Sequence, residues 1–98
     1  MATPKERELL NQLIDAAIKV NASSDFVDVT VEVDKSSVDL RISNPEEVGK
    51  PNWEWLFYAG STAYFSSDIF SEDAFIERCQ EFIGIVNGFE GYAVSEIA

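Results

Sequence analysis

The chain is 98 residues long and carries 18 acidic side chains against seven basic ones, a formal net charge of −11. Apolar residues make up 46% and aromatic residues 12%, too many for an intrinsically disordered acidic segment. Histidine is absent and Cys79 is the one cysteine, which excludes Ser-His-Asp and Cys-His nucleophiles, histidine-bound metals and cysteine-rich zinc sites. The composition therefore indicates a single acidic domain, residues 1–98.

The first predicted element is an amphipathic helix that begins at Pro4. Thr3 and Glu6 have the spacing of a capping box, and proline is favoured at the first helical position. The helix should end near Asn21, before a turn-forming cluster of serine and aspartate. Its buried stripe is expected to comprise Leu9, Leu10, Leu13, Ile14, Ala16, Ala17 and Val20.

Two strands follow, at 27–34 and 38–43. In both, apolar and polar residues alternate with a period of two, and Lys35, Ser36 and Ser37 between them form a turn. We expect an antiparallel hairpin whose valines and leucine face the core.

The remaining chain should complete an α+β fold. After a polar loop at 44–52, residues 53–58 read as a third strand and 62–65 as a short fourth strand. A second helix is expected to begin after Ser71 and end at Gly88. The tail at 89–98 fits either an edge strand or a turn of helix. The order predicts a two-layer α-β-β-β-α domain with a three- or four-stranded antiparallel sheet, an N-terminal helix and a C-terminal helix.

Motifs for catalysis and cofactor binding are absent from the sequence. It contains no G-x-S-x-G, no G-x-G-x-x-G, no P-loop and no EF-hand loop. Paired carboxylates are the remaining enzymatic option, but with eighteen acids some pair always falls at a suitable distance. We therefore expect a non-enzymatic protein with no catalytic residue, metal site or cofactor.

Acidic residues are concentrated on one face of the predicted hairpin. Residues two apart on a strand point the same way, so the outer face is expected to carry Asp28, Glu32, Asp34 and Asp39, interrupted by Arg41. Like charges on neighbouring strands destabilise a sheet. A face that tolerates this repulsion suits a basic partner, and a plain solvated sheet face is the alternative interpretation.

Further candidates for partner binding lie outside this hairpin. On the third strand, Leu56 and Tyr58 beside Glu54 have the form of an apolar anchor in an acidic surround. Trp53, Trp55 and Phe57 share the other strand face and are expected in the core. Additional acidic candidates are Glu46 and Glu47 in the loop and Glu77 and Glu81 on the second helix.

No apolar run approaches the roughly 20 residues of a membrane span, and the first residues lack an apolar signal-peptide core. Together with the lone cysteine, this predicts a cytoplasmic protein with no membrane contact. Strong negative charge disfavours direct nucleic-acid binding and favours basic partners.

In size, acidity, lack of catalytic residues and helix–sheet–helix layout, the chain resembles small phage-encoded inhibitors that imitate DNA, including anti-CRISPR and anti-restriction proteins. The resemblance spans the whole chain, has no diagnostic motif and transfers no residue by position. It implies a non-catalytic inhibitor in the host cell cytoplasm. Such an inhibitor would bind the basic surface of a nucleic-acid-binding protein, such as a CRISPR effector complex or a nuclease, and compete with DNA or RNA.

Two other functions fit the same sequence. An acidic immunity or antitoxin protein would block a toxin or nuclease through nearly the same surface charge. An acidic secretion chaperone would bind an unfolded client along an apolar groove, and would be expected to form a stable dimer.

Overall fold

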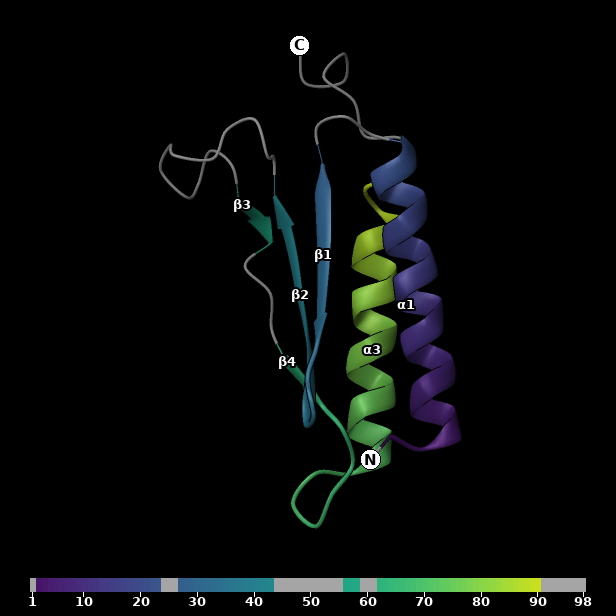
Figure 1. Cartoon of the computed structure of the whole chain (residues 1–98), viewed down its shortest axis with the longest axis vertical. Coiled ribbons are helices and arrows are strands. Elements are labelled where there is room, and N and C mark those ends of the chain that lie inside the picture. Colours follow the sequence, from purple (N-terminus) through teal and green to yellow (C-terminus); the bar gives the residue numbers. More distant parts are fainter. Residues whose placement is uncertain (1, 24–26, 44–55, 59–61, 91–98) are drawn as a thin grey trace.

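The structure, a computed structural model, describes residues 2–23, 27–43, 56–58 and 62–90, and for 56–58 the backbone alone. Helices α1 (Pro4–Ser23) and α3 (Glu72–Asn87) lie side by side against one face of an antiparallel sheet (Figure 1). The strand order is β1-β2-β3, and β4 also pairs with β2. The predicted α+β fold is therefore confirmed. Its strands are β1 (Asp28–Val33), β2 (Ser37–Ser43), β3 (Leu56–Tyr58) and β4 (Thr62–Tyr64).

Helix α1 begins with the predicted capping box. The Thr3 backbone N–H donates to Glu6 Oε1 at 2.8 Å, and the Glu6 N–H donates to Thr3 Oγ1 at 3.2 Å. The helix continues to Ser23, two residues beyond the expected end. Its buried apolar residues are Leu13, Ala16, Ala17 and Val20. The prediction that Ile14 belongs to this buried stripe was wrong, since Ile14 lies at the margin of the stripe and is exposed.

The predicted hairpin is confirmed, and its register pairs Val33 with Val38 and Val29 with Ile42. The apolar residues of β2 and Val29 of β1 are buried beneath the helices. Val33 was expected to face the core but is exposed, and Val31 is only half-buried. The reason is the position of β1, which among the described strands pairs with β2 alone and therefore forms an edge of the described sheet.

Helix α3 begins at the predicted N-cap, where Ser71 Oγ accepts a hydrogen bond from the Ala74 N–H at 3.1 Å. The ring of Phe75 stacks on that of Phe65 at 4.9 Å, which joins the helix to the residue after β4. Burial of a phenylalanine side chain contributes about 1.5–3 kcal/mol to folding. The buried stripe of α3 is the predicted one: Phe75, Cys79, Phe82 and Val86.

Both helices begin at the same end of the molecule (Figure 1). There Glu6 of α1 binds the segment that precedes α3. Its carboxylate accepts from the Ser66 N–H at 2.8 Å and from Ser66 Oγ at 3.1 Å, in addition to the Thr3 N–H. Burial would raise the pKa of Glu6, but the hydrogen bonds from Thr3 and Ser66 outweigh it and lower the pKa. One carboxylate therefore caps α1 and anchors the segment between β4 and α3.

Part of the predicted third strand is observed as β3. Trp53, Glu54 and Trp55 lie outside the described residues, as do the loop at 44–52 and the tail from residue 91. Within the ranges that the structure describes, no helix is both long enough and apolar enough to cross a membrane.

Candidate partner-binding face

The face of the sheet that the helices leave uncovered carries polar side chains. Strand alternation identifies the residues of this face, because the neighbours of a buried strand residue point to the opposite side of the sheet. We call this side the outer face. It comprises Asp28, Thr30 and Glu32 of β1, Asp39 and Arg41 of β2, and Thr62 and Tyr64 of β4.

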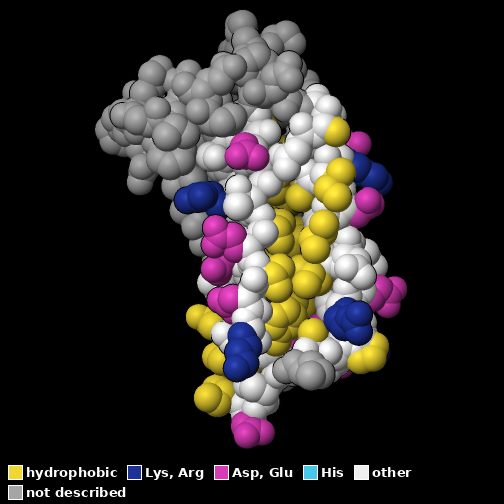
Figure 2. All heavy atoms as spheres, viewed as in Figure 1, with side chains coloured by type: hydrophobic (Ala, Val, Ile, Leu, Met, Phe, Trp, Pro, Cys, Tyr) yellow, Lys and Arg dark blue, Asp and Glu magenta, His cyan; other side chains and the backbone are white. Residues whose placement is uncertain are grey.

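Three carboxylates gather on the outer face around one arginine. Glu32 lies directly opposite Asp39 in the register, and Arg41 lies opposite Thr30. Asp28 is four residues from Glu32 on the same strand, a separation of about 13 Å. We call Asp28, Glu32 and Asp39 the acidic cluster. Acidic side chains line this side of the molecule in the space-filling view (Figure 2).

Among the residues that the structure describes, no ion pair neutralises the acidic cluster. Between described residues there are two ion pairs, Lys19 with Asp15 and Arg78 with Glu81, and both lie on the helices. The cluster and Arg41 together carry a formal charge of −2. Like charges such as Glu32 and Asp39 directly opposite one another destabilise a strand pair, so this arrangement is unfavourable for the isolated sheet.

Thr62 holds one of the three carboxylates in place. Its Oγ1 donates a hydrogen bond to Asp39 Oδ1, because β4 pairs with β2 so that Thr62 lies opposite Asp39. The sequence analysis did not identify Thr62. Only the pairing of β4 with β2 brings it to Asp39, and no local pattern in the sequence encodes that pairing.

Asp34, which was also predicted for the outer face, has a structural role at the hairpin turn. It follows the last residue of β1 and closes the hairpin turn. Its Oδ1 accepts from the N–H groups of Ser36 and Ser37, both at 2.8 Å. These backbone hydrogen bonds, that from Ser36 first, lower the pKa of Asp34. An Asx turn of this kind is a common use of aspartate at a turn.

Among the remaining predicted residues, only the two on α3 have described side chains, and these lie away from the outer face. Glu77 and Glu81 are exposed on α3, which packs against the opposite face of the sheet, and Glu81 lies 3.4 Å from Arg78 Nη1. Leu56 and Tyr58 lie on β3, where the backbone alone is described. Glu46, Glu47 and Glu54 fall outside the described residues. Of the predicted residues that can be placed, the structure thus brings together Asp28, Glu32 and Asp39.

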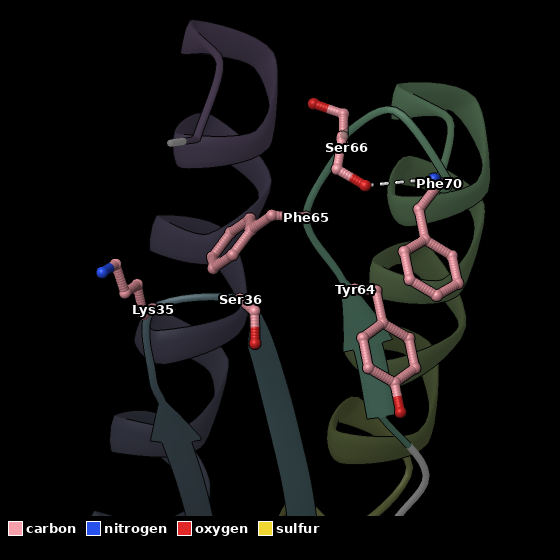
Figure 3. A pocket seen from close by; sticks show the side chains of 7 residues that line it. Lys35, Ser36, Tyr64, Phe65, Ser66 and Phe70 are labelled. Carbon is pink, nitrogen blue, oxygen red and sulfur yellow. Dashed lines mark hydrogen bonds between the residues drawn. The ribbon is translucent and has the colours of Figure 1, made fainter.

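An exposed aromatic pair lies at one end of the outer face. The rings of Tyr64 and Phe70 stack at 4.6 Å with an interplanar angle of 9°. Both line a shallow pocket together with Lys35 and Ser36 of the hairpin turn and with Phe65 (Figure 3). The sequence analysis missed this pair, because Phe70 lies outside any periodic element and meets Tyr64 only through the fold.

Comparison with protein-family models, with curated proteins and with solved structures finds no match to this chain. Among the described residues, no three Asp, Glu and Cys side chains lie close enough together to hold a metal ion. The function is therefore inferred from the outer face itself.

Proposed function

We propose that this protein is a non-catalytic acidic inhibitor that binds the basic nucleic-acid-binding surface of a partner and competes with DNA or RNA. The observation that supports the proposal most directly is the acidic cluster, three carboxylates fixed on the uncovered face of a sheet. The partner class is a CRISPR effector complex or a nuclease, as expected for an inhibitor that imitates DNA.

A rigid acidic face suits this role for a physical reason. The backbone ladder between β1 and β2 fixes the spacing of the carboxylates. A groove of lysine and arginine that binds phosphates would meet negative charges already in place, and little ordering of the acidic side needs to occur on binding. The net charge of −11 also accelerates encounter with a cationic groove.

Charge alone would make the interaction strongly salt-dependent. Tyr64 and Phe70 give the outer face an exposed aromatic pair beside the acidic cluster. Aromatic side chains are enriched at the energetic centres of protein interfaces. In this proposal the pair supplies the part of the affinity that persists at high salt, the role first expected for Leu56 and Tyr58.

Charge reversal with a matched control tests the proposal. The test variant carries Asp28→Lys, Glu32→Lys and Asp39→Lys. The control reverses Glu8, Asp15 and Glu90, which are exposed and lie outside the outer face, so both variants change the net charge equally. Each is titrated into a CRISPR effector complex or a basic nuclease loaded with labelled DNA, and DNA release is followed by fluorescence anisotropy.

We expect the wild-type protein to displace the DNA, the control to retain most of this activity, and the test variant to lose it about a hundredfold or more. Three lost ion pairs of about 1 kcal/mol or more each correspond to that factor. Equal losses in both variants would show that net charge alone governs binding. Binding that leaves the DNA in place would reject mimicry of nucleic acid.

A further inference from the structure

The hydrogen bonds between β1 and β2 show which residues of β1 direct their backbone groups toward the free edge of the sheet. The Asp34 N–H donates to the Ser37 carbonyl at 3.0 Å, in continuity with the β1–β2 ladder. Bonded and non-bonded pairs alternate along an antiparallel ladder. Thr30 and Glu32 therefore bond to β2, whereas the backbone groups of Val29, Val31 and Val33 point away from the sheet.

Asn21 occupies one part of this edge. Its side-chain Oδ1 accepts from the Val29 N–H at 2.8 Å, and its Nδ2 donates to the Val29 carbonyl at 3.0 Å. The amide thus makes the two hydrogen bonds that a neighbouring strand would make at Val29. This contact confirms independently that the odd-numbered residues of β1 face outward.

Beyond Asn21, two residues of the edge stay open. The outward N–H and C=O groups of Val31 and Val33 have no hydrogen-bond partner among the described residues. They offer two donors and two acceptors to an added strand. Such open edges are the sites at which extended peptides join a sheet.

The two sides of this open edge differ in chemistry. On the helix side, Ile18 and Ile14 lie about one and two turns before Asn21 on α1, and they are 60% and 36% exposed. Val33 itself is 50% exposed. On the other side are Asp28 and Glu32 of the outer face. Figure 2 shows this division, with hydrophobic side chains gathered between β1 and α1 and acidic side chains across the strand.

We propose that the edge of β1 at Val31–Val33 binds an extended segment of a partner protein in which basic and apolar residues alternate. The segment adds to the sheet as a further strand. Its apolar side chains lie opposite Val31 and Val33 and pack toward Ile18 and Ile14. Its basic side chains lie opposite Thr30 and Glu32, within reach of the acidic cluster. This inference does not depend on competition with nucleic acid.

A second copy of the chain fits this edge poorly. Because Asn21 blocks Val29, two edges can meet only through Val31 and Val33. Pairing Val31 with Val33 of the other copy sets Glu32 directly opposite Glu32, and pairing Val33 with Val33 sets Glu32 opposite Asp34. Like charges directly opposite are unfavourable, whereas a basic segment meets the same residues with opposite charge.

Peptides with blocked backbone groups provide the test. The probe is a short peptide in which lysine alternates with valine, and a second peptide has glutamate in place of each lysine. In the proposed register the valine N–H groups face β1 and the lysine N–H groups face away. Two isomers of equal composition, N-methylated at valine or at lysine, therefore distinguish strand addition from simple charge attraction.

We expect the lysine-methylated isomer to bind and the valine-methylated isomer and the glutamate peptide to bind about tenfold or more weakly, as for the loss of two or more hydrogen bonds. Amide exchange at Val31 and Val33 should slow in the complex. In the protein, Val33→Pro removes one outward N–H and should weaken binding more than Val33→Ala, with circular dichroism verifying the fold. If Val33→Pro does not fold, the peptide isomers decide.

Equal binding of the two methylated isomers would overturn the proposal, as would unchanged exchange at Val31 and Val33. A dimer of the free protein by light scattering, with both amides already protected, would assign the edge to a second copy instead.

Discussion

Replacing Glu6 with alanine should lower the free energy of unfolding by about 3 kcal/mol. The side chain is fully buried. Its carboxylate accepts hydrogen bonds from the Thr3 N–H at 2.8 Å, from the Ser66 N–H at 2.8 Å and from Ser66 Oγ at 3.1 Å. Hydrogen bonds to a charged group contribute about 1.5–3 kcal/mol each. Part of this sum is offset, because water can reach the half-buried Thr3 and Ser66 once the carboxylate is gone.

Glu6→Gln refines the estimate, since glutamine keeps the size but offers one acceptor oxygen and turns an N–H₂ toward donors. We expect a loss of about 2 kcal/mol. Glu8→Ala is the matched control on the same helix, because Glu8 is exposed and its removal should change stability by less than about 0.5 kcal/mol. Urea unfolding followed by circular dichroism at 222 nm measures all three variants.

The effect of Glu6 also has a predictable pH dependence. Its hydrogen bonds hold the folded-state pKa below the ordinary value of 4.5. A carboxylate with a lowered pKa stabilises the folded state fully above its ordinary pKa, and this contribution is lost as the pH falls through the folded-state value. The gap between wild type and Glu6→Gln should therefore be constant near neutral pH and narrow below 4.5. Equal, small losses in Glu6→Ala and Glu8→Ala would refute a linking role for Glu6.

Three further predictions concern single residues. Glu32→Gln should raise the free energy of unfolding by about 0.2–1 kcal/mol at low salt, because it removes the repulsion opposite Asp39, and the gain should shrink at high salt. A gain that salt leaves unchanged would have another cause. Asp34→Ala should lower the melting temperature at neutral pH, and its difference from wild type should vanish as the pH falls below 3.8, since the folded-state pKa of Asp34 is lowered. A variant as stable as wild type would contradict the turn role. The Cys79 thiol is buried and its pKa is raised to about 11, so a thiol-reactive dye should label it in urea but not in the native protein. Rapid native labelling would contradict its burial.

Local patterns predicted the elements of this fold well. The capping box at Thr3 and Glu6 and the alternation of β1 and β2 depend on neighbours along the chain, and these appear in the structure as expected. The N-cap at Ser71 belongs to the same class. Gly88 also caps its helix, although with φ −64° it does so in the ordinary right-handed region.

Contacts between distant segments were not predictable from the sequence. Glu6 reaches Ser66 across 60 residues, so a residue that explains a helix start also has a second role. The edge position of β1 leaves Val33 exposed, and sequence periodicity carries no information on which strand lies at an edge. Alternation placed Asp28, Glu32 and Asp39 of the acidic cluster correctly, whereas the hydrogen bonds that Asp34 accepts within the turn were not predicted.

The two hydrogen bonds between Asn21 and Val29 also bear on how this protein behaves when concentrated. An uninterrupted valine-rich ribbon would be a template on which further chains could stack into fibrils. The amide closes that template at one end, and an aspartate formed there by deamidation could not donate to the Val29 carbonyl. Deamidation of Asn21 would therefore free the Val29 carbonyl for a further chain, and a stored sample should be monitored for that change first.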